Sequence, residues 1–225
     1  MNFNKNNVML NHLRENVTIY IFMMTLFLTG IIFGAVTVNS MTFVQKQDLY
    51  FHLERYFIQL SGEEAIASKD ILKRSFFFHV KFLSLLFILG LTIIGLPIVW
   101  VLIFIKGLVI GFSVGFIVNQ LGGQGLLLAT LSIAPQNIII IPIYIIAGSL
   151  SMIFSLSLFY KLFGRSVSYT IGRPFLQYTF IFVVLVAIAF GGSLIETFVA
   201  NEAFKAMIKT SFTMIEDISG ITMMK

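Results

Sequence analysis

The sequence predicts an all-α, polytopic membrane protein with about five transmembrane helices, and two observations support this class. The chain has 225 residues, of which 58% are hydrophobic and only 11% are charged. Between Lys81 and Lys161 the only charged residue is Lys106. That stretch could cross a bilayer about three times, since about 20 apolar residues make one helical crossing. A soluble fold could not solvate such a surface, so we expect one integral membrane domain over residues 1–225.

The first predicted crossing is 17–38, and a polar outer segment at 39–75 follows it. Lys5 and Arg14 precede the apolar run, as basic residues do in a secretory signal peptide. However, its length of roughly 22 residues matches a whole crossing rather than the shorter apolar core of a signal peptide. We therefore expect 17–38 to be retained as a transmembrane helix.

The second and third crossings are predicted at 76–96 and 97–118, on either side of a Gly-Leu-Pro sequence that ends at Pro97. Proline closely after a glycine predicts a helix break here, because proline lacks the backbone N–H that a continuing helix needs. The third crossing leads into a short uncharged turn at 119–125.

The next apolar run, 126–160, holds about 35 residues and is too long for one straight crossing. We predict that this run is broken near Pro135, with a short half-helix or re-entrant piece at 126–134 and the main crossing at 138–160. Broken helices at membrane depth persist only where protein or water satisfies the freed backbone groups.

A linker at 161–174 precedes the last predicted crossing, 175–199, and a polar, partly amphipathic tail at 200–225. The linker contains three basic residues and no acidic one, so the positive-inside rule places it in the cytoplasm. The outer segment 39–75 balances five basic residues against five acidic ones and should lie outside. Five crossings then put the N-terminus inside and the tail outside.

An alternative treats 107–134 as one re-entrant hairpin, which leaves four crossings. It would place the basic linker 161–174 outside, against the positive-inside rule. We therefore rank this topology second.

The outer segment contains an apolar stripe at helical spacing. Its members are Leu49, Leu53, Tyr56, Phe57 and Leu60. Ser61 and Glu64 then have the spacing of a capping box, which predicts the start of a second helix leading into the next crossing. We expect the first of these helices to lie on the outer membrane surface. Its stripe either packs on the bundle or the lipid headgroups, or docks a partner outside the membrane, and both can hold.

Small residues four apart recur on three of the predicted crossings. The set consists of Gly30 and Gly34, then Gly107, Gly111 and Gly115, and finally Ala147, Ser151 and Ser155. Such spacing lets two helix backbones approach closely. It predicts helix packing within one subunit or self-association into a homo-oligomer.

Catalytic motifs are absent from the sequence. Gly111 to Gly115 reads as Gly-x-Ser-x-Gly, but Ser113 lies inside an apolar helix rather than at a strand-to-helix turn, and His79 is the only histidine near a crossing. The chain has no cysteine, and it contains no metal-binding, nucleotide-binding or paired-carboxylate motif. We predict no catalytic, cofactor-binding or metal-binding residues, and no enzymatic activity. The scattered basic residues do not favour nucleic-acid binding.

Lys106 and the Pro-Gln-Asn sequence at the predicted break form the candidate polar centre of the membrane domain. Its members are Lys106, Pro135, Gln136, Asn137 and Pro142. A lysine at membrane depth is costly and often functional. It can extend to the interface, pair with carbonyl groups at a helix break, contact a ligand or lipid headgroup, or take part in transport.

Several strings together resemble the stage II sporulation protein M family of endospore-forming bacteria. They cover most of residues 15–200 in the expected order. The strings are Val38-Asn-Ser40, Phe43-Val-Gln-Lys-Gln-Asp-Leu49, Leu89-Gly-Leu-Thr-Ile-Ile-Gly-Leu-Pro97, Lys106-Gly-Leu-Val-Ile-Gly-Phe-Ser-Val-Gly-Phe116, Val118-Asn-Gln120 and Pro135-Gln-Asn137. The wider family typically has Pro-His-Gly, a glutamate and a second proline here, whereas this chain has Gln136, Asn137 and Ile140. This departure disfavours a metal, proton or transport role.

The resemblance implies a protein of about five spans in the mother-cell membrane at the sporulation septum. It implies a complex with two peptidoglycan-degrading partners, stage II sporulation proteins D and P, which thins the septal wall so that the forespore can be engulfed. Together with the lack of catalytic motifs, it predicts a non-enzymatic scaffold that contacts membrane lipids and recruits these partners. The alternative function is a small-solute transporter or channel built on the broken helix around Pro135 and Lys106.

Overall fold

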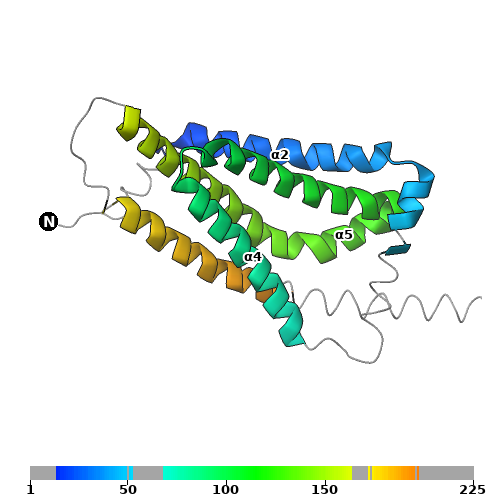
Figure 1. The fold of residues 1–225 in the computed structure, drawn as a ribbon. Coiled ribbons are helices and arrows are strands. Elements are labelled where there is room, and N and C mark those ends of the chain that lie inside the picture. The colour runs from blue at the N-terminus through cyan, green and yellow to red at the C-terminus, as the bar shows by residue number, and fades with distance from the viewer. Residues whose placement is uncertain are drawn as a thin grey trace, which may run out of the picture.

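The computed structural model describes residues 14–49, 51–52, 68–163, 172, 174–195 and 197, and these are helical or in short turns, with no strand among them (Figure 1). The labelled helices are α2 (Val17–Ser40), α4 (Ser68–Gly90) and α5 (Gly95–Phe163). A further helix covers Pro174–Ile195. Residues 43–49 and 51–52 are also helical and follow α2. This confirms the predicted all-α membrane class.

Four of the described helices are long and apolar enough to cross a membrane: Val17–Ser40, Gly95–Gln120, Asn137–Leu162 and Pro174–Ile195. α4 is a fifth long helix of 23 residues, but it is less apolar because it carries several charged residues, most of them in its first half. The count of about five is therefore consistent with the structure. The first half of α5 is one apolar helix from Gly95 to Gln120 that is long enough to cross a membrane, which favours five crossings over the alternative with a re-entrant hairpin at 107–134.

α5 is a helical hairpin whose two limbs meet at Gly122. This residue has φ 59° and ψ −136°, the only non-helical backbone within α5. Left-handed φ is costly for residues with a Cβ, and glycine avoids this cost. We call 95–121 the first limb and 123–163 the second limb. Figure 1 shows the second limb turning back beside the first.

The predicted position of the helix break, near Pro135, is wrong. The second limb remains helical through Pro135 and Pro142. A proline removes one N–H bond and can bend a helix without ending it, and Figure 1 shows the second limb curved. The chain reverses at Gly122, inside the uncharged turn predicted for 119–125.

The turn between α4 and α5 also differs from its predicted position. The turn occupies 91–94, and α5 begins at Gly95 rather than after Leu96. Pro97 lies in the first turn of α5, where backbone N–H groups have no partner within the helix, so its missing N–H costs nothing.

The helix ends gather at two ends of the bundle (Figure 1). The start of α2, the 91–94 turn, the end of α5 and the start of the 174–195 helix lie at one end, which we call the linker end. The junction of the two limbs of α5 and the helical residues after α2 lie at the opposite end, the hairpin end. This grouping agrees with the five-crossing order, in which the linker 161–174 and the outer segment 39–75 lie on opposite sides.

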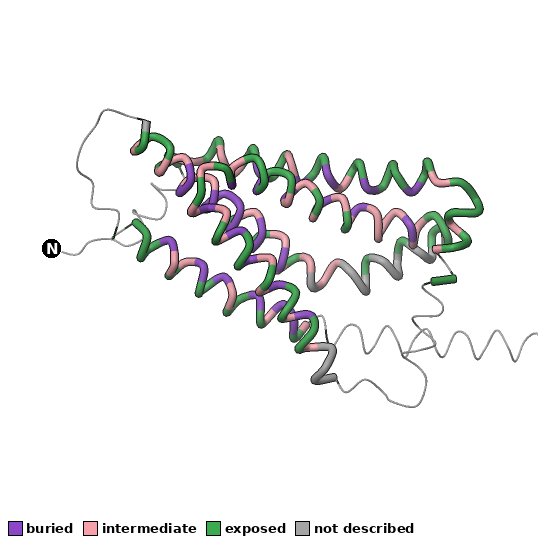
Figure 2. The backbone as a smooth tube through the Cα atoms, in the orientation of Figure 1, coloured by how far each residue is buried: buried purple, intermediate pink, exposed green. Residues whose placement is uncertain are grey.

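The second limb of α5 forms the centre of the bundle. In its most apolar stretch 56% of the residues are buried, against 22–33% in the other three candidate spans. Its buried residues form one apolar cluster with residues of α2, the first limb, α4 and the 174–195 helix, and Figure 2 shows buried positions along the second limb in purple. The outward faces of the other helices carry large apolar side chains, as lipid-facing surfaces do; examples are Ile32, Phe33, Val101, Phe180 and Val183.

Candidate functional site

The predicted glycines of the first and third crossings meet one another across the interface between α2 and the first limb. A Cβ at Gly30 would overlap the backbone oxygen of Phe104. In return, a Cβ at Gly107 would overlap the backbone oxygen of Phe27. Gly34 and Gly111 approach a backbone oxygen of the opposite helix in the same manner, whereas Gly115 lies against Ala35 in a looser contact. The five glycines therefore form one reciprocal backbone contact inside a single chain.

This contact leaves little room for a second partner on the same faces. Gly30, Gly34, Gly107 and Gly111 are buried, and Gly115 is partly buried. The contact loosens toward the hairpin end, where a Cβ at Gly115 would lie 3.1 Å from the Cα of Ala35. Self-association through these glycines would have to displace α2 from the first limb.

The predicted small residues of the second limb face the C-terminal end of α4. The Ser151 hydroxyl lies 2.9 Å from the carbonyl oxygen of Leu86 and 2.8 Å from that of Ala147, so its single proton can be shared between them. The Ser155 hydroxyl donates to the carbonyl oxygen of Thr92 at 2.7 Å. Ala147, Ser151 and Ser155 are buried. Serines here provide both close packing and hydrogen bonds between helices.

Tyr178 of the 174–195 helix makes a further hydrogen bond to the C-terminal end of α4. Its hydroxyl donates to the carbonyl oxygen of Phe87 at 3.0 Å. The last carbonyl groups of a helix have no partner inside it, so this hydrogen bond satisfies one of them inside the packed bundle. Tyr178 is not among the sequence-predicted residues, because nothing in its local pattern identifies a partner 91 residues away.

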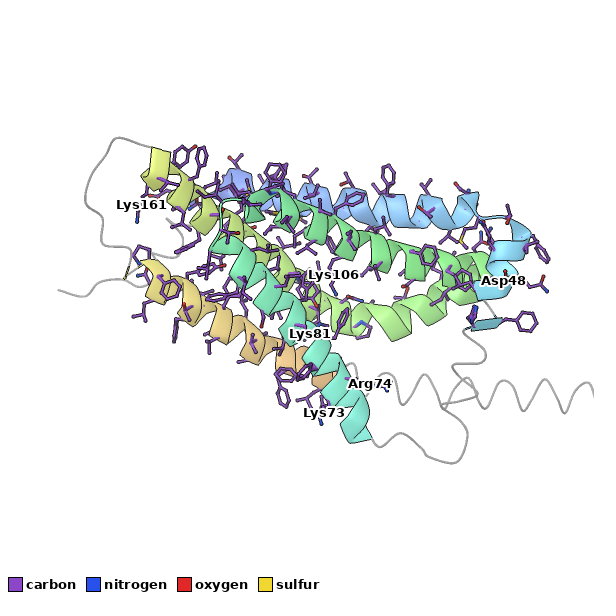
Figure 3. The ribbon with its side chains drawn as sticks, in the orientation of Figure 1. Asp48, Lys73, Arg74, Lys81, Lys106 and Lys161 are labelled. Atoms are coloured by element: carbon purple, nitrogen blue, oxygen red, sulfur yellow. The ribbon has the colours of Figure 1, made fainter. Side chains whose placement is uncertain are left out.

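Lys106 lies among three aromatic rings rather than at a helix break. Its Nζ is 4.0 Å from the ring centroid of Phe78, 4.6 Å from that of Phe82 and 4.9 Å from that of Tyr144. Phe78 and Phe82 belong to α4 and Tyr144 to the second limb, so the ammonium joins three helical segments (Figure 3). Cation–π attraction of this kind is stronger where water is excluded. We call these four residues the lysine cage.

His79 of α4 contacts Tyr144, a member of the lysine cage. Its Nδ1 lies 2.5 Å from the hydroxyl oxygen of Tyr144, and both side chains are buried. Either group can be the donor, depending on the tautomer of the imidazole. The sequence marks His79 only as a histidine near a crossing. It does not mark Tyr144 or the two phenylalanines, because only the fold brings them around Lys106.

The rest of the predicted polar centre lies along the second limb. Pro135 and Asn137 are partly exposed and Pro142 is exposed, whereas the side chain of Gln136 lies outside the described residues. Asn137 and Pro142 line a groove of about 710 Å³ between the two limbs and α2. Lys106 is not among the residues that line this groove.

The outer stripe is only partly described. Leu49 is half-buried, and Leu53, Tyr56, Phe57 and Leu60 lie outside the described residues. A different apolar set on the same segment is exposed, comprising Phe43 at 78%, Val44 at 65% and Phe51 at 55%.

The Gly-x-Ser-x-Gly string shows no hydrolase geometry. Ser113 lies within the first limb, and its hydroxyl donates to the carbonyl oxygen of Val109 one turn earlier, at 2.9 Å. Within the described ranges, no three histidine, aspartate or glutamate side chains gather as a metal site would require.

Comparison with known protein families gives a match that covers most of the chain. The family model for stage II sporulation protein M matches residues 23–201, which is most of the chain. No curated protein matches, and no solved structure matches. The matched region includes most of α2, all of α4 and α5, the lysine cage and the glycine contact. The chain therefore belongs to the stage II sporulation protein M family.

Proposed function

We propose that this protein is a non-enzymatic scaffold in the mother-cell membrane at the sporulation septum. It anchors peptidoglycan-degrading partners, stage II sporulation proteins D and P, during septal thinning and engulfment. Membership of the stage II sporulation protein M family carries this proposal, because it assigns the chain to the membrane machinery of sporulation.

The bonding pattern of the bundle supports a scaffold role. Ser151, Ser155 and Tyr178 donate to carbonyl groups of α4 or the turn that follows it, and the Lys106 ammonium lies against rings from two other segments. These groups join helices to one another. A membrane domain held in this way gives attached partners a fixed position.

The hairpin end offers a surface for such partners. Phe43, Val44 and Phe51 are exposed where the chain leaves α2, on the side predicted to face the wall. We call these three residues the outer apolar face. On a helix the positions of Val44 and Phe51 lie roughly opposite those of Lys46 and Leu49, which are partly buried. The face therefore points away from the bundle.

The physical benefit of such a scaffold is a higher local concentration of its partners. Two enzymes held on one anchor meet as if at millimolar concentration, because the second encounter becomes intramolecular. The partners carry out wall hydrolysis, and this chain fixes where it happens.

The experiment replaces the outer apolar face and measures partner recruitment in sporulating cells. In the double variant Phe43→Asp with Phe51→Asp, co-purification of both partners should fall by about tenfold or more, since buried aromatic anchors dominate interface energies. Gln45→Glu is the matched control, because Gln45 is exposed and polar and lies roughly opposite Phe43 around the helix axis. Membrane levels of all three proteins are compared by immunoblot.

The outcomes separate the docking surface from the scaffold role. Normal recruitment by the double variant would mean that the docking surface lies elsewhere on the chain. Normal recruitment of both partners to the septum in cells without this chain would overturn the scaffold role itself.

A further inference from the structure

A cleft opens between the second limb and the 174–195 helix at the linker end. Its volume is about 350 Å³. The lining residues that matter here are Leu150, Phe154 and Ile181 on the inner side and Ser157, Lys161 and Gln177 toward the end of the bundle. We call it the linker-end cleft.

The lining changes from apolar to polar along the cleft. Leu150 and Phe154 are buried at membrane depth, whereas Ser157 and Gln177 are exposed. Leu150 and Lys161 are separated by about 16 Å along the helix axis, at about 1.5 Å per residue. An occupant that fits must therefore be apolar at one end and polar at the other.

The polar end of the cleft carries positive charge. Lys161 lies in the last turn of α5, and Figure 3 shows it alone among the labelled charges at this end of the bundle. A lysine here also complements the partial negative charge of the helix C-terminus. That role alone would not require an apolar cleft beside the lysine.

We propose that the linker-end cleft binds one anionic phospholipid. One acyl chain lies against Leu150, Phe154 and Ile181. The headgroup phosphate pairs with the Lys161 ammonium, and its oxygens accept hydrogen bonds from Ser157 and Gln177. Basic pockets between transmembrane helices on the cytoplasmic side bind anionic lipid headgroups in other membrane proteins.

The size of the cleft favours a lipid over a protein partner. A helix with its side chains is about 10 Å wide and could not enter a space of this volume, whereas small-molecule sites of about 300–1,000 Å³ are common. A free phosphate would use the polar end and leave the apolar floor unfilled.

The experiment measures thermal unfolding of the purified full-length chain in a neutral detergent. The added probes are phosphatidylglycerol, phosphatidylcholine and inorganic phosphate. We expect phosphatidylglycerol to raise the unfolding midpoint saturably, by about 5 °C, because a ligand that binds only the folded state stabilises it. The other two probes should raise it far less.

Two variants locate the site. Lys161→Gln should weaken the apparent affinity for phosphatidylglycerol about fivefold, as expected for one basic contact near the surface, and Ser157→Phe should abolish saturation by filling the cleft. Lys73→Gln is the matched control, since Lys73 is an exposed lysine far from the linker end. The measured quantity is the lipid-dependent shift, so a change in the basal midpoint does not obscure it.

Three results would overturn the lipid site. The first is equal stabilisation by phosphatidylcholine, which would mean that charge is not recognised. The second is equal stabilisation by inorganic phosphate, which would indicate an anion site without a lipid. The third is an effect of Lys73→Gln as large as that of Lys161→Gln, which would indicate general surface charge.

Discussion

The hydroxyl of Tyr178 donates to the carbonyl oxygen of Phe87 at 3.0 Å, while the two rings stack with their centroids 5.0 Å apart. The Tyr178 ring also stacks on the ring of Phe154, with the two centroids 4.5 Å apart. One side chain thus links the 174–195 helix to both α4 and α5. Its hydroxyl supplies a donor to the C-terminal end of α4, where the last carbonyl groups have no partner within the helix.

Tyr178→Phe should destabilise the bundle by about 1 kcal/mol. The ring and its stacking remain, but the carbonyl oxygen of Phe87 loses its donor, and hydrogen bonds between membrane helices contribute about 0.6–1.7 kcal/mol. The check is reversible unfolding in mixed micelles. Tyr160→Phe is the matched control because Tyr160 is exposed, and it should change the free energy of unfolding very little. Equal changes in the free energy of unfolding for the two variants would mean that the hydrogen bond from Tyr178 does not stabilise the bundle.

Gly111→Ala should destabilise the contact between α2 and the first limb by about 1–3 kcal/mol. A Cβ there would overlap the carbonyl oxygen of Ile31, and a backbone cannot move aside as a flexible side chain can. Gly123→Ala is the matched control, since nothing lies within 4 Å of a Cβ at that position. The control should be neutral or slightly stabilising, because alanine favours the helix over glycine. The same unfolding measurement compares both variants.

Hydropathy is sufficient to predict the class and most of the crossings. Apolar runs bounded by polar segments mark the helices because the bilayer fixes their length. The predicted break within 126–160 is wrong because it assigns the end of a helix to Pro135, whereas the main crossing predicted at 138–160 agrees with the apolar helix Asn137–Leu162. A proline at membrane depth can be accommodated by bending, and Gly122 provides the reversal instead.

Side-chain partners across helices could not be predicted from the sequence. The small-residue spacing marks Gly30 and Gly107 as close-approach positions, but it does not say which helix each one meets. Likewise, the sequence marks Lys106 as a costly charge, whereas its rings on α4 and the second limb become neighbours only when three segments pack together.

The lysine cage should show energetic coupling between Lys106 and Phe78. Phe78→Leu removes the ring nearest the ammonium. It should therefore lower the free energy of unfolding by about 1–2 kcal/mol more in the native chain than in a chain that carries Lys106→Met. The measurement is a double-mutant cycle of unfolding free energies. Phe77→Leu serves as the control, because Phe77 is exposed beside Phe78 and makes no such contact among the described residues. A coupling energy near zero would mean that the Phe78 ring does not stabilise the Lys106 ammonium.

Cysteine labelling should place the two ends of the bundle on opposite sides of the membrane. The chain has no cysteine, so each single substitution reports on one position. In intact protoplasts a membrane-impermeant maleimide should label Gln47→Cys and Gly123→Cys, which lie at the hairpin end. Leu162→Cys at the linker end is 72% exposed and should react only after permeabilisation. If Leu162→Cys reacts in intact protoplasts together with Gln47→Cys, the five-crossing order fails, because an odd number of crossings separates the hairpin end from the basic linker.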